Sequence, residues 1–263
     1  MAERSELAGQ DLLAFVVHGD LQTRAQKALN NEQYEAAQAL RARQDEVATV
    51  MQQRSDARRQ RGGEASPAEA EAELANAQAR MLVLRSSLNA AVAEERYAEA
   101  ASLRDQLAAA EGSAAAAAAA LQAAKAAVFR FALGQRVVHA VHRWAGVVAG
   151  MDRCFADSQA FARACAVDDL PRGRQQPFYV VLPDAGDVGD SECVMYVAED
   201  RLRPLPPLAA GDACPEPVAH SFAYHLYLGP DAQGGYIPTR ELRERYGAPR
   251  VDVWPPGEEP DDG

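Results

Sequence analysis

The chain has 263 residues, which is enough for about two domains with cores of their own. Its formal net charge is −11 and its pI is near 5.0. An acidic chain repels phosphate at long range, which argues against a purely electrostatic DNA binder. Residues 129–206 carry 9 basic and 10 acidic side chains, so a local basic face can still form there.

The four cysteines show neither a C-x-x-C spacing nor a disulfide-dense pattern, which indicates small buried side chains in a reducing, intracellular compartment. The apolar run from Leu12 to Val17 is too short to span a bilayer. The acidic N-terminus lacks the Arg- and Ser-rich character of an organelle transit peptide. We therefore expect a soluble intracellular chain without membrane contact. The cysteines are Cys154, Cys165, Cys193 and Cys214.

Composition changes abruptly near residue 129. Only three aromatic residues and one proline precede this point, in a segment rich in Ala, Leu, Glu, Gln and Arg that favours helix. The later part is rich in aromatic residues and prolines, which favours strands and loops. The predicted fold class is therefore α+β.

The helical part contains a repeat, because residues 21–41 and 84–104 align at an offset of 63 residues. In each copy Tyr, Ala and Leu recur three residues apart, so they share one face of a helix that can pack on a preceding short helix. Each copy is therefore predicted to form an αα-hairpin in which the tyrosine is a packing anchor between the helices. The coinciding pairs are Leu21/Leu84, Ala28/Ala91, Glu32/Glu95, Tyr34/Tyr97, Ala37/Ala100, Leu40/Leu103 and Arg41/Arg104.

The segments between and after the two copies also carry helix signals. Gly62–Gly63 is expected to end one helix, and Ser66, Pro67 and Glu69 supply the N-cap, first position and capping-box partner of the next. The seven consecutive alanines at 114–120 predict a helical spacer, with a partly frayed low-complexity linker as the alternative.

The following segment is typical of a small β-barrel. Runs of β-branched residues at 135–143, 146–152, 178–184 and 193–200 predict strands, and residues 158–167 predict one short helix. A glycine- and aspartate-rich loop joins the last two strands.

The expected domains form one series along the chain. They are an N-terminal segment at 1–20, hairpins at 21–60 and 67–110, a helical spacer at 111–128, a barrel at 129–206, a C-terminal extension at 207–250 with a short helix around Thr239–Tyr246, and a disordered acidic tail at 251–263.

Neither metal binding nor catalysis is predicted. On a strand, the spacing of His139 and His142 places them on opposite faces, so both cannot ligate one ion without another element. The loop containing Asp184, Asp187 and Asp190 lacks the alternating acids of a calcium site. No nucleophile elbow, phosphate-binding glycine loop or convincing acid pair occurs. We expect no enzyme activity, no cofactor, no metal site and no small-molecule substrate.

The stretch LPRGRQQPFYVV, residues 170–181, is the candidate recognition face of the barrel. Its arginines lie on a loop, and of its two adjacent aromatic residues one is expected to pack the core while the other stays available. Such a surface can hold phosphate and stack a base, but nearby acids cancel much of its field, so any DNA binding should be weak and strongly salt-sensitive. The predicted face comprises Arg172, Arg174, Gln175, Gln176, Phe178 and Tyr179, and the opposing acids are Asp168, Asp169 and Asp184.

Residues 97–105, YAEAASLRD, resemble the UVR motif, the helical hairpin named from the UvrB and UvrC repair proteins. The first copy, residues 34–42, departs from that pattern by having Gln38 for alanine and Ala42 for aspartate. The resemblance implies docking of a protein partner, although the arginines could equally pair with acids on their own helices. The implied partner-binding residues are Tyr34, Glu35, Leu40, Arg41, Tyr97, Glu99, Leu103, Arg104 and Asp105.

Residues 129–206 resemble the YccV/HspQ family, which is often labelled hemimethylated-DNA-binding. The shared features are a Gly-Gln-x-Val start at Gly134, a Trp-x-Gly-Val turn at Trp144, a Gln-Pro-Phe-Tyr strand at Gln176 and a Tyr-Val-Ala-Glu strand at Tyr196. The resemblance implies an SH3-like barrel. The aromatic tail beyond it is similar to the extension found in eukaryotic members, including certain F-box proteins.

A UVR motif followed by a YccV-like domain resembles the ClpF family of chloroplast Clp protease adaptors. That resemblance implies a non-enzymatic adaptor whose partners are a Clp-type chaperone or protease, a co-adaptor and substrates, and it suggests the chloroplast stroma. The alternative is a protein that binds hemimethylated DNA through its YccV-like domain. A purely structural or oligomer-forming module is a third hypothesis.

Overall fold

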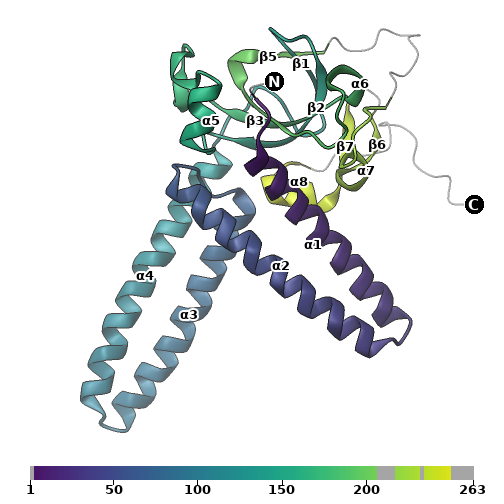
Figure 1. Ribbon diagram of the computed structural model, residues 1–263. Helices are drawn as coiled ribbons and strands as arrows, with labels where there is room; N and C mark the ends of the chain where they lie inside the picture. Colours follow the sequence, from purple (N-terminus) through teal and green to yellow (C-terminus); the bar gives the residue numbers. More distant parts are fainter. Residues whose placement is uncertain (1–2, 206–216, 232–233, 250–263) are drawn as a thin grey trace, which may run out of the picture. The chain divides into compact units, whose positions relative to one another are not determined.

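The structure is a computed structural model that describes residues 3–205, 217–231 and 234–249 (Figure 1). The acidic tail predicted at 251–263 and the predicted buried thiol of Cys214 lie outside the described residues.

The chain divides into two compact units. The first comprises Met1–Glu64, Phe129–Arg243 and Ala248–Gly263, and the second comprises Ala65–Val128 and Glu244–Gly247. The two sequence repeats therefore belong to different units.

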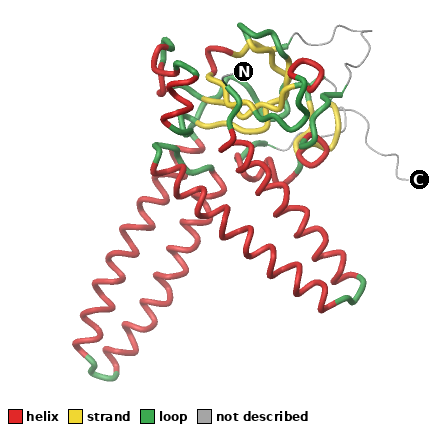
Figure 2. Tube along the Cα trace, viewed as in Figure 1, coloured by secondary structure: helices red, strands yellow, loops and turns green. Residues whose placement is uncertain are grey.

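The N-terminal half forms two helical hairpins, in agreement with the predicted helical part (Figures 1 and 2). Helices α1 (Glu6–Asn30) and α2 (Tyr34–Gln60) form the first, and α3 (Pro67–Ala93) and α4 (Tyr97–Lys125) form the second. Ser66 accepts a hydrogen bond from the Glu69 amide and completes the predicted capping box. Among the described residues, none of the helices has the length and apolar character that a bilayer crossing requires.

The two hairpin turns have the same backbone geometry. Glu32 and Glu95 both adopt left-handed conformations, with φ of 59° and 56°. The amides of Gln33 and Arg96 donate to carbonyls of the preceding helix at 2.9 and 2.8 Å. The repeat in the sequence thus specifies a turn conformation that is uncommon for residues other than glycine.

Two expected boundaries in the helical half differ from the structure. Helix α1 already begins at Glu6, so residues 6–20 are part of the first hairpin. Helix α4 continues through the alanine run to Lys125, so the predicted spacer is the second arm of the hairpin. Ala117 and Leu121 are buried, and α4 packs along α3, with Lys125 Nζ 3.6 Å from Glu71 Oε1. Alanine allows this close approach because its side chain is small.

The C-terminal half of the chain contains an antiparallel sheet of five strands in the order β4-β3-β2-β1-β5. Strands are coloured yellow in Figure 2. The strands are β1 (Arg136–His139), β2 (Ala145–Asp152), β3 (Phe178–Pro183), β4 (Met195–Ala198) and β5 (Leu202–Pro204). All four predicted strand segments are confirmed by the first four of these strands.

The prediction of a closed barrel is wrong for the described residues. They form an open sheet with β4 and β5 as its edges. The segment before α1 covers the β4 edge: Arg4 forms a bridge with Met195, and the Ser5 amide donates to the Val194 carbonyl at 3.0 Å. The amide of Tyr196 donates to the Glu3 carbonyl at 2.9 Å. Edge strands need such cover because their unpaired backbone groups otherwise recruit other strands.

Short helices complete the β-rich part. The predicted helix is confirmed as α5 (Gln159–Ala164), and the Ser158 hydroxyl caps it. The loop between β3 and β4 holds a short helix that composition did not predict, α6 (Ala185–Val188), because Asp184 caps its first turn. The remaining elements are three 3₁₀ turns at Val167–Asp169, Gly173–Gln175 and Glu199–Arg201, followed by α7 (Ala223–Leu226), β6 (Tyr227–Pro230), β7 (Tyr236–Pro238) and α8 (Arg240–Tyr246).

The described part of the C-terminal extension packs on the start of the sheet. Tyr227 Oη donates to the Val148 carbonyl at 2.8 Å, and the Tyr236 amide donates to the Gly134 carbonyl at 2.9 Å. Gly134 has a φ of 78°, and a Cβ placed there would lie 2.0 Å from the Tyr236 carbonyl oxygen. The close approach of β7 therefore requires glycine at this position.

We predict that Gly134→Ala lowers the free energy of unfolding by about 2–4 kcal/mol, because it combines a left-handed backbone with a clash against backbone. Gly173→Ala is the matched control, since its φ is 50° and a Cβ there meets open space. We expect the control to lose only about 1 kcal/mol. Urea denaturation measures both, and equal losses would contradict the proposed clash.

Candidate functional site

The predicted recognition loop does not present free arginines. Arg172 Nη2 lies 2.7 Å from Asp200 Oδ1 and 3.0 Å from Glu199 Oε1. Arg174 forms a bidentate ion pair with Asp168, in which Nε donates to Oδ1 at 2.6 Å and Nη2 donates to Oδ2 at 2.9 Å. The hydrogen bonds that Arg172 donates to Asp200 and Glu199 raise the pKa of Arg172, and the hydrogen bond from Arg174 lowers the pKa of Asp168. A phosphate would have to displace these carboxylates.

The expectation that one of the two adjacent aromatic side chains stays available is wrong. Phe178 is buried in a cluster with Phe155 and Tyr196, at ring-centroid distances of 5.3 Å from each. Tyr179 is equally buried against Phe131. Both faces of β3 are therefore covered, and neither ring can stack a base.

Buried polar groups hold this part of the sheet together. Tyr179 Oη donates to Glu199 Oε2 at 2.7 Å and accepts the Arg130 amide at 3.0 Å, and burial raises the pKa of the tyrosine. Gln176, a third member of the predicted face, is fully buried and accepts the Asp200 amide at 3.1 Å. Of that face, Arg172, Arg174 and Gln175 retain solvent contact.

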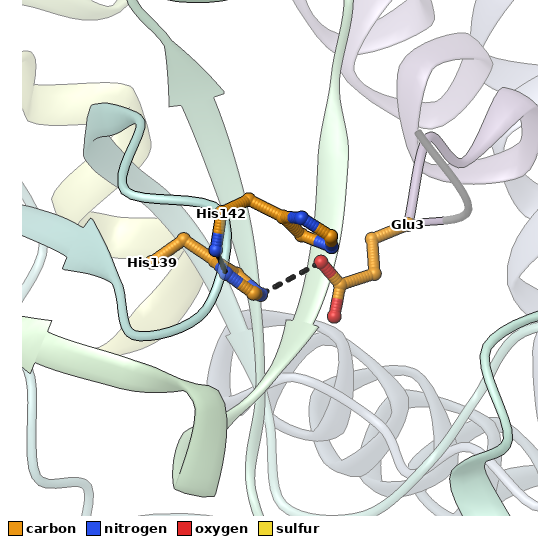
Figure 3. A group of neighbouring side chains, drawn as sticks. All are labelled: Glu3, His139 and His142. Atoms are coloured by element: carbon orange, nitrogen blue, oxygen red, sulfur yellow. Dashed lines mark hydrogen bonds and ion pairs between the residues drawn. The ribbon is translucent and has the colours of Figure 1, made fainter.

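A second cluster joins the N-terminal segment to the sheet (Figure 3). The buried carboxylate of Glu3 lies 2.8 Å from His139 Nε2 and 2.7 Å from Arg201 Nη1. Burial alone would raise the pKa of Glu3, but hydrogen bonds from His139 and Arg201 outweigh it, so the pKa is lowered. No sequence pattern points to Glu3, because it is an isolated acid before the first helix.

The two histidines lie on the same side of the structure, contrary to the expectation of opposite faces. Strand β1 ends at His139, and the chain then turns, with Arg143 in a left-handed conformation at φ 65°. The rings of His139 and His142 stack at 4.7 Å with an interplanar angle of 23° (Figure 3). Trp144 stacks on His139 at 5.2 Å. The alternation of a strand does not apply across a turn.

Glu3, His139 and His142 place their potential ligand atoms within 4.8 Å of one another. However, His139 Nδ1 accepts the amides of Val141 and His142 at 3.2 and 2.9 Å, so the ring proton of the neutral form is on Nε2 and points at Glu3. A metal on Nε2 would require the proton on Nδ1 instead. The arrangement therefore suits a hydrogen bond and does not suit a metal ion.

The hairpin residues differ from their predicted role as packing anchors. Tyr34 is 66% exposed and Tyr97 is 69% exposed, because each is the first residue of a helix and projects from the turn. The residues buried at these turns include Ala37 and Ala100. Arg104 pairs with its neighbour Asp105 at 3.1 Å.

The other residues of the predicted docking set lie around these turns. Glu35 and Arg41 are exposed, Leu40 and Leu103 are half-buried, and Glu99 pairs with Arg96. Their role in partner binding stays a prediction.

One comparison with known proteins identifies part of the chain. Residues 129–226 match the family model described as "Hemimethylated DNA-binding protein YccV like". The match extends 20 residues past the predicted boundary at 206 and reaches the end of α7. No solved structure matches the chain. The chain therefore contains a YccV-like domain, and the resemblance to that family is confirmed for this segment.

We predict that Glu3→Gln lowers the free energy of unfolding by about 2–3 kcal/mol at neutral pH, because the buried amide leaves a donor facing His139 or Arg201. The lowered pKa of Glu3 stabilises the fold above its ordinary value of 4.5, and this contribution is lost as the pH falls below it. The deficit of the variant should therefore shrink below pH 4.5. Denaturant titrations at several pH values measure this, with exposed Glu46→Gln as control. A deficit that is constant with pH would contradict it.

Proposed function

We propose that the YccV-like domain binds DNA and distinguishes hemimethylated duplexes from unmethylated ones. The observation that carries the proposal is the family match over residues 129–226. The family match supports this hypothesis over that of a Clp adaptor, for which the sequence offers the UVR resemblance.

The charges of the domain favour DNA binding through a small number of arginine–phosphate contacts. The net charge of −11 opposes DNA, and several arginines of the domain are held by carboxylates. Within the matched segment, Arg130, Arg143 and Arg163 are exposed and make no ion pair with any described residue. Binding through at most about three arginine–phosphate contacts implies a slope of log K against log salt no steeper than about −3.

The test is fluorescence anisotropy with one DNA sequence in unmethylated, hemimethylated and fully methylated forms at physiological salt. We expect the hemimethylated duplex to bind most tightly, with the shallow salt slope given above. Equal and negligible binding of all three duplexes would overturn the proposal. A slope steeper than −6 would contradict the small number of phosphate contacts.

A second candidate function is protein docking by the hairpin turns, as in an adaptor for a Clp-type chaperone or protease in the chloroplast stroma. Two exposed tyrosines on turns of similar backbone geometry support it, since Tyr34 and Tyr97 contribute little to the hairpin cores. Exposed tyrosine is enriched in protein interfaces because a large rigid ring buries area at low entropic cost. In this adaptor role, the protein would also bind a co-adaptor and the substrates that are delivered to the protease.

We predict that Tyr97→Ala weakens binding of a purified Clp-type chaperone about tenfold while leaving the hairpin folded. Leu82→Ala is the matched control, because Leu82 is 68% exposed on α3 away from the turn. Tyr34→Ala tests whether the first copy also binds. Surface plasmon resonance gives the affinities, and wild-type protein that fails to bind the chaperone would remove this candidate.

A further inference from the structure

The turn between β1 and β2 has an unusual surface for this domain. Val141 is 69% exposed, and His142 and Arg143 beside it are also exposed. Among the described residues of the matched segment, Val141 and Tyr224 are the exposed large apolar side chains. Val141 lies two residues from an arginine that has no carboxylate partner in the described part of the chain.

Hydrogen bonds to His139 hold the backbone of this turn. Its Nδ1 accepts the amides of Val141 and His142, and the Arg143 amide donates to the His139 carbonyl at 2.9 Å. His139 is itself clamped by Glu3 and by stacking between His142 and Trp144. The turn is therefore ordered before any ligand arrives, which lowers the entropic cost of binding.

The left-handed conformation of Arg143 is held by the same contacts. A non-glycine residue at φ 65° is uncommon, and such conformations persist where the surrounding structure imposes them. Asp187, whose carboxylate lies close to this turn, accepts the Ala145 amide at 2.7 Å and forms no ion pair with Arg143 in the described part of the chain.

The chemistry of a methylated base matches this pair of side chains. The methyl groups of 5-methylcytosine and N6-methyladenine both lie in the major groove, where an apolar side chain can contact them. A guanidinium can make two hydrogen bonds to the O6 and N7 atoms of guanine in the same groove. A turn that presents valine and arginine together can therefore contact a methyl group and an adjacent guanine.

We infer that the β1–β2 turn is the element of this domain that contacts DNA, with Val141 against the base methyl group and Arg143 on the guanine edge. The inference rests on the proposed DNA-binding function and assigns it to a surface. The loop with Arg172 and Arg174 is excluded as that surface because its aromatic residues are buried and its arginines are paired. Arg163 on α5 and Tyr224 on α7 do not combine the two chemistries in one short turn.

The experiment uses the full chain and measures anisotropy with hemimethylated and unmethylated duplexes. One pair of duplexes carries 5-methylcytosine in CpG, and another carries N6-methyladenine in GATC. Arg143→Gln should weaken binding to both forms of the recognised sequence about tenfold, and Arg143→Lys should recover only part of this loss because a lysine lacks the planar fork. Val141→Ala should reduce the preference for the methylated form about threefold and leave binding to the unmethylated form within twofold.

Two exposed positions serve as controls. Arg43→Gln removes an exposed arginine of α2, outside the matched segment, and Leu228→Ala removes an apolar side chain that is 70% exposed. Both should bind like wild type, and thermal unfolding checks that all variants are folded. If wild type discriminates between the duplexes and both turn variants do so unchanged, the assignment to this turn is wrong while the proposed function stands. If Val141→Ala keeps the full preference, the methyl contact is wrong. If wild type binds none of the duplexes, the proposed function itself fails.

Discussion

The buried carboxylate of Glu3 is the contact on which the arrangement of the sheet depends. The backbone of Glu3 pairs with the edge strand β4, while its side chain reaches His139 at the end of β1 and Arg201 just before β5. One residue thus connects the two edges of a sheet that no ladder of backbone hydrogen bonds closes within the described ranges 3–205, 217–231 and 234–249. A buried charge is costly unless it is paired, so these contacts make the N-terminal segment part of the domain. The same contact orients His139, which in turn holds the β1–β2 turn.

The same use of charge recurs elsewhere in the first unit. The buried Glu199 binds Arg172 and Tyr179, and Asp152 binds Arg58 at 3.2 Å and Tyr196 at 2.8 Å. Carboxylates at the ends of the strands therefore pair with arginines that a simple count of charges would treat as free to bind DNA. For this reason the net charge of the segment describes its long-range field but does not identify its binding surface. The surface is defined by which cations remain unpaired after folding.

Local features of the sequence predicted the local structure well. The strands β1 to β4, the capping box at Ser66 and the repeated hairpin turns all follow from short-range patterns. The failures involve contacts between distant segments. The burial of Tyr179 depends on Phe131, 48 residues away, and the anchoring of Glu3 depends on Arg201, 198 residues away. Periodicity carries no information about such pairs, and the alanine run likewise revealed its helix but not the helix it packs on.

The repeat in the sequence does not give two equivalent hairpins. The base of the first hairpin contacts the end of β2, with Arg58 on Asp152, Glu64 on Arg153 at 2.8 Å and the Gly62 carbonyl on the Cys154 thiol at 3.3 Å. These contacts place it in the same unit as the sheet, whereas the second hairpin forms the other unit. The turns, by contrast, keep the same conformation and the same exposed tyrosine in both copies. The two copies therefore share the conformation of the turn, but they differ in the contacts made at the base of the hairpin. If the turns bind protein, a partner on the first hairpin is held by the same unit as the β1–β2 turn that we propose contacts DNA.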